Sequence, residues 1–207
     1  MPTLARLLLV CASLLLGPLV VMADELPKDT NKITSLTVEQ AQRLAETFPG
    51  VVIEVTVAKE KLQWSNCLPL NALKNLGADV ARSLAGYSKG PLSLNGLTTL
   101  SDEAAKALAQ HEGWDGQLPN LTALDSPDSV AIAQALATRK GLLALPNLKK
   151  ISPKTLTALI EKWDVEIPLI ETLELIPEPD GSPNDDFTIP EWLEVRQEQK
   201  RAAQQGP

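Results

Sequence analysis

Residues 91–113 read PLSLNGLTTLSDEAAKALAQHEG and contain a complete pattern of strand, turn and helix. Leu92-Ser93-Leu94 alternates apolar and polar residues, which predicts a very short, half-buried strand. Asn95-Gly96 then permits a tight turn. Ser101, followed by two acidic residues, predicts a helix N-terminus, and Gly113 offers a left-handed residue at which that helix can end. The stretch is therefore one strand–turn–helix unit.

The apolar positions of this unit recur along the chain. The pattern is an apolar residue, two others, a second apolar residue, and then Leu or Ala five and eight residues further on. The intervals from Leu73 to Leu97 and from Leu97 to Leu121 are each 24 residues. In one copy the helical positions come four residues late, which is about one helical turn and keeps the buried face in place. The copies are Ile33, Leu36, Ala41 and Leu44; Leu73, Leu76, Ala81 and Leu84; Leu97, Leu100, Ala105 and Leu108; Leu121, Leu124, Ala133 and Leu136; Leu148, Ile151, Leu156 and Leu159; and a degenerate start at Ile170.

Further helix boundaries support the same unit. Ser126-Pro127 and Ser152-Pro153 each predict a serine N-cap with proline at the first helical position. Gly90 and Gly141 offer left-handed C-caps. Since one unit cannot bury its apolar stripe alone, we expect an α/β solenoid of stacked units of about 24 residues, with helices on one side and short parallel strands on the other. The alternative is an irregular α-helical repeat bundle, because strands of three residues are weak evidence.

Three consecutive stretches resemble a known family. LPLNALKNLGADVARSLAGYSKG, PLSLNGLTTLSDEAAKALAQHEG and GQLPNLTALDSPDSVAIAQALATRKG resemble the short leucine-rich-like repeats of exported planctomycete-type bacterial proteins. The resemblance covers residues 33–163 and is strongest over residues 68–160. It implies a leucine-rich-repeat-like solenoid that serves as an interaction scaffold.

The asparagines depart from the family's repeat, which places Asn two residues beyond the second strand leucine. Asn71 and Asn95 follow the strand leucine directly, and Asn120 and Asn147 stand one residue further on. The sequence therefore does not predict a regular asparagine ladder or a regular horseshoe curvature.

Residues 1–23 have the order of a secretory signal peptide. Met1–Arg6 carries one positive charge, Leu7–Val21 is uncharged, and Val21-Met22-Ala23 suits signal peptidase. An uncleaved anchor is the alternative, but the apolar run is shorter than the roughly 20 residues of a spanning helix and contains Gly17-Pro18. We expect export to the periplasm, the envelope or the medium, with no stable membrane span after cleavage.

The rest of the chain divides into three parts. Residues 24–67 hold a degenerate repeat and a β-rich insertion, whose strand Val51–Val57 is expected to cap the N-terminal edge of the array. Residues 68–163 hold the clear repeats. Residues 164–207 comprise a degenerate last repeat, a Pro/Asp loop, a C-terminal capping helix that Thr188 and Glu191 can box-cap, and a polar tail.

Composition narrows the chemistry. The chain carries a net charge of -7; Arg6 is the single charged residue of the signal, which leaves -8 on the remainder, and such a surface repels nucleic acid. Cys67 and His111 are each alone in the mature chain, so neither a disulfide, a zinc site nor a catalytic triad is expected. Asp180, Asp185 and Asp186 match no calcium loop and are expected to form a solvated turn. No cofactor or metal is expected.

Three functions remain open. The first is a non-enzymatic exported module that binds a protein or an envelope polymer through its strand side, with Ser93, Asn95 and Gln117 as candidate surface residues between buried leucines. The second is a structural protein of the envelope that self-associates end to end through weakly capped repeats. The third is a hydrolase that uses surface carboxylates, although no pair stands out.

Overall fold

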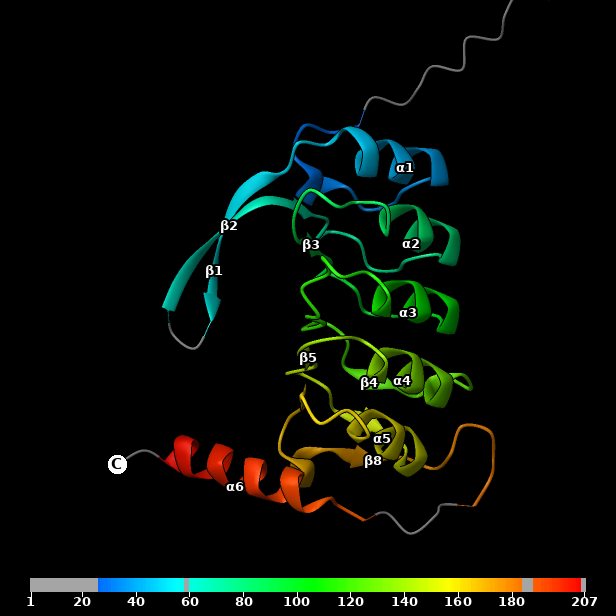
Figure 1. Ribbon diagram of the computed structural model, residues 1–207. Coiled ribbons are helices and arrows are strands. Elements are labelled where there is room, and N and C mark those ends of the chain that lie inside the picture. The colour runs from blue at the N-terminus through cyan, green and yellow to red at the C-terminus, as the bar shows by residue number, and fades with distance from the viewer. Residues whose placement is uncertain (1–25, 58–59, 184–187, 206–207) are drawn as a thin grey trace, which may run out of the picture.

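The computed structural model describes residues 26–57, 60–183 and 188–205 (Figure 1). Within these ranges the protein is a mixed α/β structure with six α-helices and small open sheets, and the strands exclude the all-helical alternative. The helices are α1 (Val38–Thr47), α2 (Ala78–Leu84), α3 (Asp102–Ala109), α4 (Ser129–Ala137), α5 (Pro153–Ile160) and α6 (Glu191–Gln205), with short 3-10 helices at Thr30–Lys32 and Ile170–Thr172. The strands are β1 (Val51–Val57), β2 (Glu60–Pro69), β3 (Leu92–Ser93), β4 (Ala123–Leu124), β5 (Leu143–Ala144), β6 (Lys150–Ile151), β7 (Val165–Glu166) and β8 (Glu174–Leu175).

Helices α1 to α5 lie side by side in chain order, with β3 and β5 on the opposite side of the stack (Figure 1). Helices α2 to α5 are each the crossover between two extended segments that pair in parallel, which is the direction such a crossover imposes. One row joins β2 to β3, continues through isolated bridges, and ends with β5 and β7. A second row contains β4, β6 and β8. The strand predicted at Leu92-Ser93-Leu94 is thus confirmed as β3.

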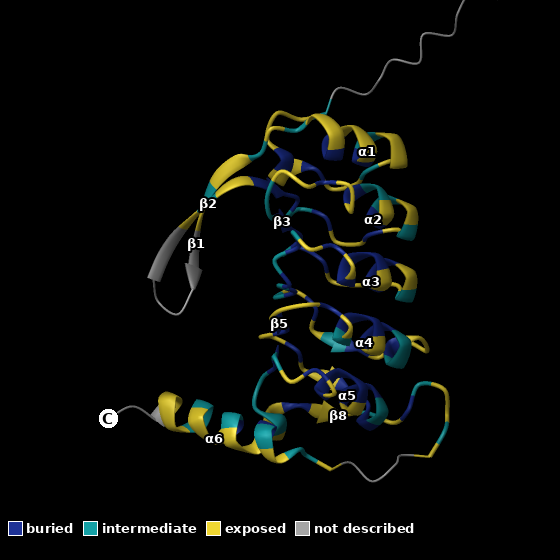
Figure 2. Cartoon of the chain, viewed as in Figure 1, coloured by how far each residue is buried: buried dark blue, intermediate teal, exposed yellow. Residues whose placement is uncertain are grey.

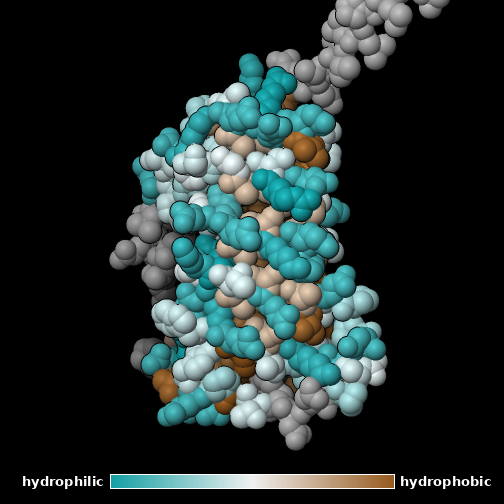
Figure 3. Space-filling model, turned by 45° about the vertical axis from the view of Figure 1, so that its right-hand side comes forward, coloured by the Kyte–Doolittle hydropathy of each residue, from teal (hydrophilic) through white to brown (hydrophobic). Residues whose placement is uncertain are grey.

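The predicted apolar positions form the core (Figure 2). The last leucine of each of four helices, at positions 84, 108, 136 and 159, has no exposed surface. Leu36, Leu100 and Ile170 are partly buried, and every other position of the pattern is buried. Burying one leucine side chain contributes about 1.5–3 kcal/mol, so each leucine of this column stabilises the fold substantially. The helix side of the stack is mostly hydrophilic, with a narrow apolar strip along it (Figure 3).

The asparagines form a ladder that the sequence did not predict. Asn71 Oδ1 accepts a hydrogen bond from the Asn95 backbone N–H at 2.9 Å. Asn120 Nδ2 donates to the Asn95 carbonyl at 2.6 Å, and Asn147 Nδ2 donates to the Pro119 carbonyl at 2.8 Å. These side chains satisfy backbone groups in the turns between the two rows of strands. The asparagines can differ by one residue in their sequence position because each side chain still reaches a backbone group of the neighbouring turn.

Helix starts are confirmed in part. Ser101 and Ser152 cap α3 and α5 through their side chains, and Pro153 stands in the first turn of α5. The start predicted at Ser126-Pro127 is wrong: α4 begins at Ser129, after a turn in which the Ser129 N–H donates to the Ser126 carbonyl at 3.0 Å. This turn accounts for most of the four-residue shift by which Ala133 and Leu136 follow later in their copy than the helical positions of the other copies.

The predicted left-handed C-caps at Gly90 and Gly113 are wrong. Helices α2 and α3 end in right-handed residues whose N–H groups bond back into the helix. Gly90 is required for close approach instead, because a Cβ there would lie 2.4 Å from the Asn66 carbonyl oxygen of the neighbouring unit. Gly141 has a positive φ, but it stands four residues beyond the end of α4.

The two ends of the stack differ. At the N-terminal end, β1 and β2 form an antiparallel hairpin, with Val51 opposite Cys67, that projects away from the helices (Figure 1). At the C-terminal end, α6 lies against the last strand segments. The predicted signal peptide, Asp185 and Asp186 lie outside the described residues. In the part of the chain that the structure describes, no helix combines the length and apolar character needed to cross a membrane.

Candidate functional site

Ser93 was expected on the surface, and that expectation is wrong. Its side chain is 1% exposed, and its hydroxyl donates to Asn71 Oδ1 at 3.0 Å. The Asn71 side chain of the preceding unit is in contact with it. Ser93 is therefore part of the asparagine ladder and not a free contact residue.

Asn95 and Gln117 keep part of their surface exposed. The backbone of Asn95 is held on both sides by the asparagine ladder, while its own side-chain oxygen is buried without a hydrogen-bond partner among the described residues. The Gln117 N–H donates to Asp115 Oδ1 at 3.0 Å. Gln117 also bridges in parallel to Ala144, which in turn pairs with Glu166 of β7. Residues paired in register point to the same face, so Gln117, Ala144 and Glu166 form one row across the strands.

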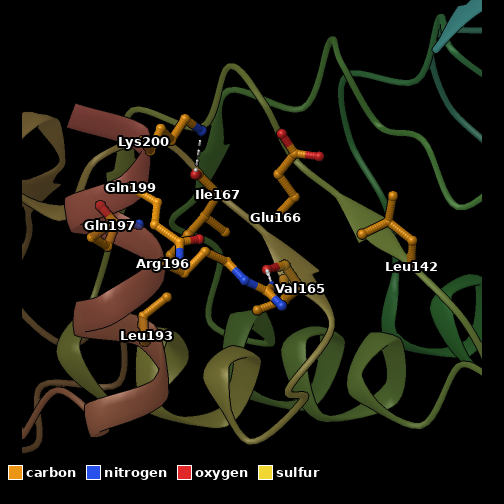
Figure 4. Close-up of a pocket in the computed structure, with 9 residues that line it drawn as sticks. All are labelled: Leu142, Val165, Glu166, Ile167, Leu193, Arg196, Gln197, Gln199 and Lys200. Carbon is orange, nitrogen blue, oxygen red and sulfur yellow. Dashed lines mark hydrogen bonds between the residues drawn. The ribbon is translucent and has the colours of Figure 1, made fainter. Parts of the chain in front are cut away.

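This row leads into a groove of about 420 Å³ between α6 and the strand segments (Figure 4). The buried side chains of Val165, Ile167 and Leu193 line it. Arg196 and Lys200 of α6 stand on one wall and Glu166 of β7 on the other (Figure 4). The remaining lining residues are Leu142, Gln197 and Gln199.

Helix α6 is held there by hydrogen bonds to strand carbonyls. Arg196 Nη1 donates to the Val165 carbonyl at 3.0 Å, and Lys200 Nζ donates to the Ile167 carbonyl at 2.9 Å (Figure 4). Four residues of a helix rise about 6 Å, and two residues of a strand span about 6.6 Å. Side chains at i and i+4 of α6 therefore match the spacing of alternate carbonyls on an extended segment. The helix covers these carbonyls at the end of the stack without adding a strand.

Gln197 completes this attachment. Its Nε2 donates to the Pro168 carbonyl at 3.1 Å, and its Oε1 accepts from the Ile170 N–H at 3.0 Å. The side chain is 3% exposed, so it is a structural bridge. Arg196 lies over the ring of Trp192, with 5.5 Å from the guanidinium carbon to the ring centroid, which further fixes its position.

A polar cluster behind the groove positions Leu142, which is 44% exposed at the rim. Arg139 Nη1 donates to the Lys140 and Leu142 carbonyls at 2.6 and 2.8 Å. Lys162 Nζ donates to the Arg139 carbonyl at 2.6 Å and pairs with Asp164 at 2.6 Å. The loops that follow α4 and α5 are thereby tied together. The sequence analysis missed this cluster, although basic residues directly after two successive helices were a visible signal.

Three titratable groups near the strands are shifted by burial. Burial raises the pKa of the Asp115 carboxyl to about 6, against a smaller lowering by the Gln117 N–H. Burial raises the pKa of the Cys67 thiol to about 11, which keeps this buried thiol protonated. Burial lowers the pKa of His111, whose Nδ1 accepts from the Gly113 N–H at 2.9 Å. His111 is thus a neutral, structural residue at neutral pH.

The groove therefore combines an apolar floor with two cations, one carboxylate and amide groups at its rim. Such a surface suits binding of a chain that offers both apolar and hydrogen-bonding groups. Among the residues that the structure describes, no group of three or more His, Cys, Asp or Glu side chains is arranged to hold a metal ion. Comparison with protein-family models, characterised proteins and solved structures found no match to this chain.

Proposed function

We propose that this protein is an exported, non-enzymatic binding module, built as a leucine-rich-repeat-like solenoid, that holds an extended peptide or polymer on its strand side. The order of α1 to α5, the two rows of parallel pairs and the asparagine ladder support a solenoid of stacked units. The predicted signal peptide supports export. The observation that carries the binding function is the groove between α6 and β7.

The groove and the row beside it favour an extended ligand over a compact one. Gln117, Ala144 and Glu166 lie on three adjacent segments, so the row spans about 10 Å at the usual spacing between strands. Ala144 in the middle is buried, with 3% of its surface exposed, so the ligand contacts Gln117 and Glu166 on either side of it. A chain that crosses the strands meets the amide of Gln117 and the carboxylate of Glu166 in turn, and then enters the groove beside Leu142.

The position of Leu142 suits an anchoring contact. Its side chain is 44% exposed although the cluster around Arg139 holds its backbone in place. A residue whose backbone is fixed in this way loses little backbone freedom on binding, which favours affinity. The neighbouring cations Arg196 and Lys200 provide charge and hydrogen bonds for specificity.

The test is to identify ligands with the purified protein as bait in envelope and secreted extracts, and then to measure the affinity of each isolated ligand. We expect Leu142→Arg to weaken binding at least tenfold, because it removes the apolar contact and adds a third cation to the rim. Val38→Arg on α1 is the matched control, since Val38 has a similar exposure of 39% and lies on the helix side. Equal affinities for the two variants contradict the groove assignment.

A further inference from the structure

The β1–β2 hairpin presents an open strand edge. In the described sheet the order is β1-β2-β3, so β1 pairs with β2 along one edge and has no neighbouring strand on the other. β3 contacts only the end of β2, at Leu68 and Pro69. The hairpin projects from the strand side of the stack (Figure 1). Two strands alone are marginally stable in water, and an unpaired edge is a template for a further strand.

β1 carries few of the usual protections of an edge strand. Its sequence VVIEVTV contains no proline and no lysine, and all its residues except Glu54 are β-branched. The single irregularity in its pairing lies at the base, between Val51 and Ile53. Val51 and Val52 are 41% and 62% exposed. A seven-residue segment of this kind has high β-propensity and low charge, the features of segments that pair with others.

We infer that β1 is a strand-addition site whose occupant is β1 of a second copy of this chain, paired antiparallel about a two-fold axis. The result is a four-stranded sheet in which the two β1 strands are central. A two-fold contact pairs the open β1 edges of both copies with each other in one step. An unrelated strand added to β1 would leave its own outer edge unpaired. Each strand is about 23 Å long, which is sufficient for several pairs of backbone hydrogen bonds.

Glu54 restricts the register. A two-fold axis through Glu54 places two carboxylates directly opposite each other, which is unfavourable. An axis through Ile53 instead places Val52 opposite Glu54 of the other copy and Ile53 opposite itself. This arrangement also differs from end-to-end stacking of units, since α6 covers carbonyls of the last strand segment.

Sedimentation equilibrium of the full protein over a concentration range tests this inference. We expect a monomer–dimer equilibrium whose dissociation constant rises at least tenfold in Val52→Lys, because a charge on a strand edge opposes addition. Val38→Lys, the same change at an exposed position of α1, is the control and is expected to dimerise as the wild type does. A wild type that stays monomeric at high concentration overturns the inference, and so does a dimer that Val52→Lys leaves intact.

Hydrogen exchange gives a second readout that does not depend on a variant. The backbone amides of Val51–Val57 are expected to exchange more slowly at a concentration where the dimer dominates, while those of α1 to α5 are unchanged. Dimerisation without added protection in β1 places the contact elsewhere and also overturns the inference. Both experiments are independent of the groove between α6 and β7.

Discussion

Asp115 lies beside the strand row with a raised pKa, and replacing it with asparagine tests the burial of that row. The pKa of its carboxyl is about 6 in the folded protein and 3.8 in its ordinary state, because burial disfavours the charged form. Because this pKa is raised, the folded state is more stable when the carboxyl is protonated than when it is charged. Stability from this group is therefore fully present below pH 3.8 and is lost as the pH rises through about 6.

The magnitude follows from the size of the shift. Each pKa unit corresponds to about 1.4 kcal/mol, so a shift of roughly two units destabilises the folded state by about 3 kcal/mol at pH 7.5. Because Asp115 keeps some exposed surface, this is an upper value. Asp115→Asn removes the charge, and its side-chain oxygen still accepts a hydrogen bond from the Gln117 N–H. We expect the variant to be more stable than the wild type by about 1–3 kcal/mol at pH 7.5.

Urea unfolding followed by circular dichroism between pH 4 and pH 8 measures this difference. The stability gain of Asp115→Asn should shrink as the pH falls through about 6 and be small at pH 4. Asp125→Asn, which removes an exposed carboxylate in the next unit, controls for the change in net charge. A gain that does not vary with pH, or a variant less stable than the wild type at pH 7.5, refutes the assignment of Asp115 as a buried, destabilising charge.

Three further predictions concern packing. Leu136→Ala, at a leucine with no exposed surface in α4, should lower the free energy of unfolding by about 2–5 kcal/mol in urea titration; a loss below 1 kcal/mol contradicts a close-packed column. Asn71→Ala should cost about 1–3 kcal/mol because Asn71 Oδ1 accepts two hydrogen bonds, whereas Asn147→Ala removes one exposed bond and should cost less; equal losses argue against the ladder. Gly96→Ala should lower the melting temperature markedly because its Cβ would lie 2.0 Å from the Asn71 carbonyl oxygen, and Gly77→Ala, with nothing within 4 Å, is the control.

The helices and the buried apolar positions were largely predictable because the signals are local. The spacing of leucines defines a buried face, and the serine caps at Ser101 and Ser152 act within one helical turn. The same reasoning failed at Ser126-Pro127, where the Ser126 carbonyl accepts a hydrogen bond within a tight turn that precedes the helix. It also failed at Gly90, where the glycine is required by a neighbouring unit and not by its own helix.

The candidate site was hardly predictable. Of the three residues singled out, Gln117 lies in the row that leads into the groove, Asn95 is held in the ladder, and Ser93 is enclosed. The residues that line the groove come from segments about 30 positions apart, such as Val165 and Arg196. No short-range sequence pattern predicts that two such distant residues come into contact.

Sequence alone determined the alternation of strand and helix and the identity of the buried leucines, because these depend on periodicity and on caps that act over a few residues. Only the tertiary structure decided which polar groups remain accessible. Ser93 is buried in contact with the Asn71 side chain of the preceding unit, and Leu142 is exposed because Arg139 holds its backbone at the rim. The groove exists because the i, i+4 spacing of Arg196 and Lys200 matches alternate carbonyls of an extended segment, a match that arises only when α6 packs against it.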